Sequence, residues 1–332
     1  MSPKNGSGFL RQGLQSLYRR WQLIAGSEYD ADVASLRPSL PREDRPLVRA
    51  QMEACLEAQG GEVLARARAA ALGQAYMALN ATGRKNFLRL MAAEFDLDED
   101  DIQESLDDLR AARTPEERRR ARRSLRRATE SPRARILTRF NALPEGVKFL
   151  VDLRADLIPL AREDPLLASL DDDLKDLLAS WFDVDFLELR RISWQTASGA
   201  LLEKFMAYEA VHPVESWEDL KNRLDYDRRY FAFFHPRMPQ EPLIFVEVAL
   251  VQGLTGNIQE LLDPEAPQLD PAEADSAIFY SISSAQKGLA GVSFGGFLIK
   301  RVVDQLAREF PGLKTFSTLS PLPTFLPWVL ET

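Results

Sequence analysis

The spacing of apolar residues divides the chain into two parts. Between Arg45 and about Trp181, apolar positions recur every three or four residues, which is typical of amphipathic helices. One predicted stripe consists of Val48, Met52, Cys55 and Leu56, and another of Phe87, Leu90, Met91 and Phe95. This part is therefore predicted to be an all-α domain in which helices pack on helices.

Several helix boundaries can be predicted within this part. Thr114-Pro115-Glu116-Glu117 combines a capping residue, a proline at the first helical position and acids in the first turn, so a helix should start there. Further breaks are expected near residues 81–83, Ser131-Pro132, Leu143-Pro144 and Asp164-Pro165.

After Trp181 the pattern changes to short apolar and aromatic runs, which predict strands. These runs are Phe186–Trp194, Tyr230–Phe234, Leu243–Val251, Ala277–Ser283 and Thr315–Leu319. Helices are expected over Ala200–Ala210, from Ser216 with Asp219 as a capping partner, and over the apolar repeat Ile299–Phe310. Short turns make the early strands antiparallel, and a helical crossover makes the last two parallel. A mixed sheet follows.

Polar residues inside the apolar runs have two interpretations each. Glu247 could be a pocket carboxylate, but we expect it to face solvent from a half-buried strand. Tyr280, Ser281 and Ser283 could donate to a ligand, although packing and sheet pairing are the default.

Four glycines lie between the last two predicted strands, directly before a helix. They are Gly288, Gly291, Gly295 and Gly296. Glycines let the backbone approach a ligand, and the first helical turn offers free N–H groups and a partial positive charge, which favour phosphate. The loop has neither the lysine-serine ending of a P-loop nor the dinucleotide-binding spacing. A tight turn that needs small residues is the alternative.

Composition and charge exclude several classes. The net charge of −8 argues against general nucleic-acid binding. One cysteine, Cys55, excludes an intrachain disulfide and a cysteine metal cluster, and two histidines make a multi-histidine site improbable. No apolar run approaches the ~20 residues of a membrane span. We expect no metal, no nucleic acid and no membrane among its partners, and a cytoplasmic location.

Two basic stretches require comment. Residues 118–127 read RRRARRSLRR and could bind phosphate, but a solvated helix that pairs with the acids of 96–108 is favoured. The first 27 residues carry four basic side chains and no acid, which suggests a mitochondrial presequence or, as we prefer, a basic amphipathic helix.

The second part contains long, unusual motifs: AVHPVESWEDLKNRL (210–224), RRYFAFFHPRMPQEPLIFVEVAL (228–250), AIFYSIS (277–283), QKGLAG (286–291), GGFLIKRVV (295–303) and FSTLSPLP (316–323). In these motifs the chain resembles the malonyl-CoA decarboxylase family. The resemblance covers about the last third of the chain firmly, and extends weakly back to about Trp181.

The resemblance implies a fold and a site. The catalytic domain should have an acetyltransferase-like (GNAT-type) fold, in which the loop after the fourth strand holds the CoA diphosphate. It implies Ser320 as the catalytic serine, Gln286 at the loop's opening, and CoA contacts from Ala290, Gly291, Val292, Ser293, Phe294, Gly295 and Gly296. Of the nearby lysines, Lys287 is better placed than Lys300 to meet CoA phosphates.

The implied reaction is decarboxylation of malonyl-CoA to acetyl-CoA and carbon dioxide. It requires a carboxylate held out of the thioester plane, donors for the enolate oxygen, and a proton for the carbon. Because a thioester stabilises an enolate, no metal or organic cofactor is expected. The alternative is an acyl-CoA-binding or acyltransferase domain of the same fold without decarboxylation.

One family feature is missing from the sequence. The resemblance implies a catalytic histidine in an Asn-Pro…Phe-His motif well after the serine, whereas Thr332 is the last residue here. His212 and His235 fall in upstream motifs and are interpreted as structural. We therefore expect the acetyltransferase-like domain to be partial, and this chain alone to release no carbon dioxide from malonyl-CoA.

The predicted organisation is a helical oligomerisation domain over residues 1–182 and a partial CoA-binding catalytic domain over 183–332. Helices with more apolar surface than one core needs often pair with copies of themselves. A homo-oligomer, dimer or tetramer, is expected through the helical domain.

Overall fold

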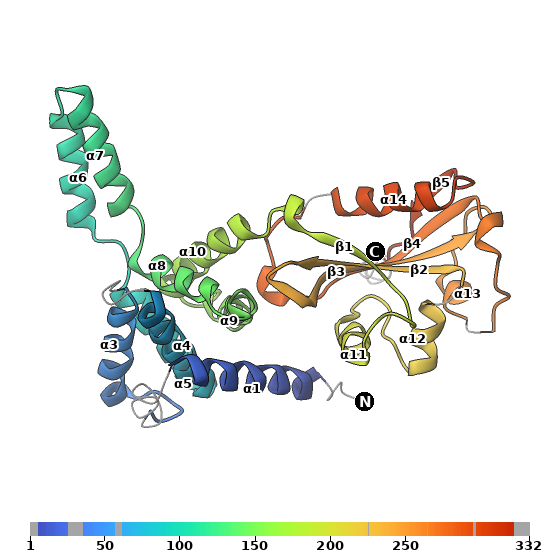
Figure 1. Cartoon of the computed structure of the whole chain (residues 1–332), viewed down its shortest axis with the longest axis horizontal. Coiled ribbons are helices and arrows are strands. Elements are labelled where there is room, and N and C mark those ends of the chain that lie inside the picture. The colour runs from blue at the N-terminus through green and yellow to red at the C-terminus, as the bar shows by residue number, and fades with distance from the viewer. Residues whose placement is uncertain are drawn as a thin grey trace, which may run out of the picture. The chain divides into compact units, whose positions relative to one another are not determined.

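The structure is a computed structural model that describes residues 6–25, 36–56, 62–224, 226–263, 265–294 and 297–321. It divides into two compact units, one of Met1–Trp181 with Gly288–Val292 and one of Phe182–Lys287 with Ser293–Thr332. The first unit is helical and the second contains a sheet (Figure 1). No described helix is both long enough and apolar enough to span a membrane.

The helical unit consists of α1 (Gly6–Ala25), α3 (Arg45–Leu56), α4 (Glu62–Ala78), α5 (Ala81–Glu94), α6 (Glu99–Ala111), α7 (Pro115–Ala128), α8 (Pro132–Arg139), α9 (Gly146–Ala161) and α10 (Pro165–Trp181). The predicted starts are confirmed at three of them. Thr114 and Glu117 form a reciprocal capping box before α7, Ser131 caps α8, and α10 begins at Pro165.

An aromatic cluster forms the core of this unit. The Trp21 ring of α1 lies 4.8 Å from that of Phe149 and 5.8 Å from that of Phe140, centroid to centroid. Its indole N–H donates to the carbonyl of Pro144 at 3.0 Å. On α4, a Cβ on Gly73 would stand 2.1 Å from the Trp21 ring, so this close approach requires glycine.

Helices α6 and α7 form an antiparallel hairpin (Figure 1). Between the two helices, the hydroxyl oxygens of Ser105 and Ser124 lie 3.5 Å apart. The arginines between Arg118 and Arg127 are all exposed, which confirms the solvated helix. The expected ion pairs with the acids of 96–108 are not formed, so that prediction is wrong. No guanidinium nitrogen of these arginines lies within 4.0 Å of a carboxylate oxygen in the described residues.

The second unit consists of β1 (Glu188–Ile192), α11 (Gly199–Tyr208), α12 (Trp217–Arg223), β2 (Arg228–His235), β3 (Met238–Val251), α13 (Ile258–Leu262), β4 (Ser276–Ser284), α14 (Phe297–Glu309) and β5 (Thr315–Thr318). The strand order is β1-β2-β3-β4-β5. The first three pairings are antiparallel and β4–β5 is parallel. The predicted all-α region followed by a mixed, acetyltransferase-like sheet domain is therefore confirmed.

Helices cover both faces of the sheet. Figure 1 shows α14 on one face and α11, α12 and α13 on the other. On the second face Phe205 of α11 packs against Tyr230 and Phe245, with ring centroids 4.8 and 5.3 Å away. Ser216 caps α12 as predicted, while Asp219 accepts from the N–H of Glu215 rather than from the cap itself.

Candidate functional site

The parallel pairing of β4 and β5 ends close to Ser320. Four residue pairs join the strands, the last of them Phe279 with Thr318. One further backbone bond follows, from the N–H of Leu319 to the carbonyl of Phe279 at 2.8 Å. Ser320 is thus the first residue beyond the last bond of this ladder, and it is exposed.

Strand β4 continues past this point without a neighbouring strand on that side among the described residues. It runs on to Ser284, and in the described part of the chain β5 provides no partner beyond Leu319. A β-bulge lies at the same level, because Val248 pairs with Phe279 and Glu247 with Ser281, so that Tyr280 has no partner in β3. Bulges re-aim backbone groups and often adjoin functional sites. The β4–β5 pairing therefore ends beside Ser320.

The predicted CoA loop begins with a buried glutamine. The side-chain amide of Gln286 donates to the carbonyl of Pro242 at 2.8 Å, which ties the loop's start to β3. Further on, Phe294 is buried with its ring 6.5 Å from that of Phe182, centroid to centroid, and Ser293 is exposed. Gly295 and Gly296 lie outside the described residues.

The middle of the loop groups with the helical unit. Gly288 packs so closely on α9 that a Cβ there would stand 1.7 Å from the carbonyl oxygen of Val151. Ala290 and Gly291 are exposed and Val292 is buried. Gly291 has a φ of +76°, a left-handed conformation that favours glycine. No motif in the sequence predicts that α9 contacts this segment.

Glu247 does not face solvent. It is fully buried, so that expectation is wrong. Its Oε2 lies 3.5 Å from Nη1 of Arg223, a residue of α12, while Oε1 has no hydrogen-bond partner in the described part of the chain. Burial raises the pKa of Glu247 to about 8, although Arg223 acts in the opposite direction.

A second carboxylate lies in the same interior. Glu209 accepts hydrogen bonds from the hydroxyls of Ser281, at 2.9 and 3.0 Å, and of Ser283, at 3.0 Å. It also accepts from the N–H groups of Val211 and His212. These serines therefore serve an internal network, and the carboxylate has the hydrogen bonds that a buried charge needs.

The two histidines are held by local contacts. The Nδ1 atom of His235 accepts from the N–H of Arg237 at 3.1 Å, which stabilises the β2–β3 turn. The carbonyl of His212 accepts from Arg223 at 2.7 Å. Lys287 and Lys300 are both exposed. Among the described residues, no three histidine, cysteine or acidic side chains form a group that could hold a metal ion.

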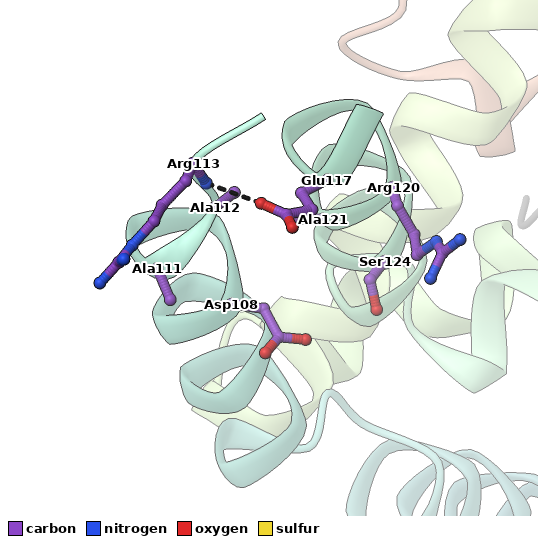
Figure 2. A pocket seen from close by; sticks show the side chains of 8 residues that line it. All are labelled: Asp108, Ala111, Ala112, Arg113, Glu117, Arg120, Ala121 and Ser124. Atoms are coloured by element: carbon purple, nitrogen blue, oxygen red, sulfur yellow. Dashed lines mark hydrogen bonds between the residues drawn. The ribbon is translucent and has the colours of Figure 1, made fainter. Parts of the chain in front are cut away.

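An open groove lies elsewhere, along the seam of the α6–α7 hairpin (Figure 2). It contains none of the predicted site residues. Glu117 on its wall is already used by the capping box and by the N–H of Arg113, at 2.8 Å. The groove is lined by Asp108, Ala111, Ala112, Arg113, Glu117, Arg120, Ala121 and Ser124.

Comparisons with known proteins identify the family. Residues 185–332 match the malonyl-CoA decarboxylase C-terminal domain and residues 95–182 the N-terminal domain. The crystal structure of malonyl-CoA decarboxylase from Rhodopseudomonas palustris is 40% identical with a TM-score of 0.80, over 86% of this chain and 69% of that one. The chain belongs to the malonyl-CoA decarboxylase family. The enzyme from Agrobacterium vitis is 38% identical with a TM-score of 0.79, over 86% and 68% of the two chains.

Two curated relatives that the chain matches are longer than it is. The mitochondrial malonyl-CoA decarboxylase of the goose Anser anser anser is 37% identical over 280 residues, which are 80% of this chain and 55% of that protein. The mitochondrial enzyme of Mus musculus is 43% identical over 207 residues, which are 60% and 42%. The chain thus spans about half the length of these relatives.

Proposed function

We propose that this protein decarboxylates malonyl-CoA to acetyl-CoA and carbon dioxide, with Ser320 as its catalytic serine. Membership of the malonyl-CoA decarboxylase family supports the reaction. The position of Ser320 supports its role, because an exposed hydroxyl follows directly on the last β4–β5 backbone bond, from Leu319 to Phe279. This single observation carries the proposal.

The edge of β4 beyond the β4–β5 pairing is proposed to supply donors for the chemistry. Beyond Phe279 the edge of β4 has no partner strand in the described part of the chain, so its backbone N–H groups can meet a ligand. A thioester carbonyl laid against this edge would gain donors for the oxygen that becomes negative as carbon dioxide leaves. The Ser320 hydroxyl is the group proposed to meet the acyl part, and Pro321 holds its backbone extended.

The loop after β4 is proposed to bind the CoA diphosphate. Its exposed members Ala290, Gly291 and Ser293 can approach a ligand, and Gly291 has the backbone freedom for a close approach. Gln286 is proposed to act by fixing the loop's start through Pro242. Val292 and Phe294 would contribute backbone groups, because their side chains are buried, and Gly295 and Gly296 are proposed on the resemblance alone.

No metal or organic cofactor is proposed for the reaction. The thioester delocalises the negative charge, and a positioned side chain or water can deliver the proton to carbon. The family resemblance implies that the proton donor is a histidine after the serine, in a motif that is not found in residues 1–332.

We also propose a homo-oligomer formed through the helical unit, and a cytoplasmic location. The hairpin of α6 and α7 supports the homo-oligomer, because its exposed surface is not buried in the core of the helical unit. The single thiol, Cys55, is buried, and burial raises its pKa to about 11, which suits a protein kept reduced.

The reaction is tested with the protein expressed from its complete gene. Release of carbon dioxide from malonyl-CoA and formation of acetyl-CoA are measured by mass spectrometry in the presence of a metal chelator. We expect both products in equal amounts. Tight CoA binding without either product would contradict the proposed reaction and favour a non-decarboxylating acyl-CoA domain.

A further inference from the structure

A buried arginine of α9 holds the middle of the loop that follows β4. Nη1 of Arg154 donates to the carbonyl of Gly288 at 2.7 Å and to that of Ala290 at 2.8 Å. Its Nε and Nη2 atoms donate to Asp171 of α10 at 2.9 and 3.3 Å. All these residues belong to the helical unit, and Arg154 is only 2% exposed. The segment from Gly288 to Ala290 is therefore anchored by a paired, desolvated charge.

This anchor determines the direction of the next amide. In a planar trans peptide the C=O and the following N–H point in opposite directions. Because the carbonyl of Ala290 points at Arg154, the N–H of Gly291 points away from it. Gly291 is exposed, and its N–H has no acceptor in the described part of the chain. Its φ of +76° is a left-handed conformation that glycine adopts readily.

A lysine of α10 stands beside this amide. The Cε and Nζ atoms of Lys175 lie 3.4 and 3.7 Å from the point that a Cβ on Gly291 would occupy. Lys175 is half-buried and forms no ion pair with a described residue. The acid one turn earlier, Asp171, is occupied by Arg154. An ammonium without an ion pair to any described residue therefore lies beside Gly291, the residue whose N–H points away from Arg154.

We propose that Lys175 and the N–H of Gly291 together bind a phosphate group of CoA, with Arg154 as the residue that positions the amide. This inference rests on the proposed function, since it names a further binding residue for the same substrate. The chain is acidic overall, with a net charge of −8, so an anionic thioester needs local positive charge. A lysine ammonium is a compact charge with rotatable donors, which suits a phosphate oxygen.

The test is calorimetric titration of the chain with CoA, dephospho-CoA and pantetheine. Lys175→Ala should weaken CoA binding by about tenfold or more, the effect of one charge-assisted hydrogen bond. Pantetheine, which has no phosphate, should bind both proteins equally. Lys85→Ala is the matched control, because Lys85 is a half-buried lysine of the same unit without an ion pair in the described residues. It should leave CoA binding unchanged.

The outcomes separate this inference from the proposed function. Equal CoA affinity of Lys175→Ala and the unaltered chain would overturn the inference and leave the function standing. Absence of CoA binding by the unaltered chain would overturn both. A loss that persists with dephospho-CoA assigns Lys175 to the diphosphate, and a loss seen with CoA alone assigns it to the 3′-phosphate; both results support the site.

Arg154 is tested as a positioning residue. Arg154→Met should weaken CoA binding without changing pantetheine binding, while Arg154→Lys, which keeps a donor, should recover part of the loss. A merely structural role would instead lower both affinities together. Because Arg154→Met leaves Asp171 unpaired and can impair folding, Gly291→Ala serves as the second variant. An alanine strains the φ of +76° and places its Cβ 3.4 Å from Cε of Lys175, so it should shift the exposed amide. Unchanged CoA affinity in that variant would contradict the proposed role of the Gly291 N–H.

Discussion

Glu247 of β3 lies with its Oε2 atom 3.5 Å from Nη1 of Arg223 of α12, inside the sheet domain. Arg223 is shared, since it also donates to Asp219 at 2.8 and 3.0 Å. Glu209, the other buried carboxylate nearby, raises the pKa of Glu247 further. Burial is the main cause of the raised pKa of Glu247, Glu209 adds to it, and the shared Arg223 offsets only part of it.

The first prediction concerns stability and pH. The pKa of Glu247 is about 8 in the folded chain, above the ordinary value of 4.5. Between these values the unfolded chain loses the proton while the folded chain keeps it, so the free energy of unfolding should fall as pH rises from about 5 to 8. Each unit of difference between the folded and unfolded pKa values corresponds to about 1.4 kcal/mol, so the free energy of unfolding should fall by several kcal/mol over this range.

Glu247→Gln should flatten this part of the profile, because a neutral amide has no proton to lose. Urea unfolding at several pH values measures the slope. Glu218→Gln, on the exposed surface of α12, is the control and should keep the slope of the unaltered chain. An unchanged slope in Glu247→Gln would show that Glu247 is ionised in the folded protein.

The second prediction concerns the close packing of Gly288. A Cβ at this position would stand 1.7 Å from the carbonyl oxygen of Val151, so Gly288→Ala must displace the loop from α9. The free energy of unfolding should fall by about 1–3 kcal/mol, as for other overpacked sites. Gly256→Ala is the control, because nothing lies within 4 Å of its Cβ position. Equal stability of both variants, measured by urea unfolding, would refute the close contact.

The third prediction concerns the basic helix α7. Its exposed arginines lie beside α6, which carries the acids Glu99, Asp100, Asp101, Glu104, Asp107 and Asp108. The hairpin therefore has nearly balanced charge, and we expect no binding of duplex DNA in a gel-shift assay at 150 mM salt. Nucleic-acid binding that weakens steeply with salt would identify α7 as a phosphate-binding surface instead.

The fourth prediction concerns assembly. Light scattering should give a mass that is a multiple of the 37.5 kDa chain, twofold or fourfold. Cross-linking of a mixture of isotope-labelled and unlabelled protein should then place the intermolecular links within the helical unit. A monomer mass at micromolar concentration, or links confined to the sheet domain, would contradict the proposed interface.

Much of the fold follows from local sequence signals. The capping box of Thr114 and Glu117 needs residues only three positions apart, and the structure confirms it. The antiparallel early strands and the parallel β4–β5 pair could be predicted because short turns and one helical crossover leave few arrangements. Both the capping box and these strand pairings follow from residues and connections that are close together in the sequence.

The remainder depends on contacts that are distant in sequence. Arg154 and Ala290 are 136 positions apart, and no motif next to either residue predicts their contact. Glu247 was expected to face solvent because one charge in an apolar strand usually does. Its burial depends on Arg223 and on the helices that cover that face of the sheet, which no periodicity within β3 reveals.

The central claim is that Ser320 acts on the acyl group of malonyl-CoA. The most direct measurement, made on the protein expressed from its complete gene, is the rate of carbon dioxide release by Ser320→Ala, with Ser317→Ala as the matched serine inside the β4–β5 ladder. The account predicts that Ser320→Ala loses turnover by at least a hundredfold and still binds CoA, while Ser317→Ala keeps its activity. A Ser320→Ala enzyme that releases carbon dioxide at the unaltered rate would contradict it.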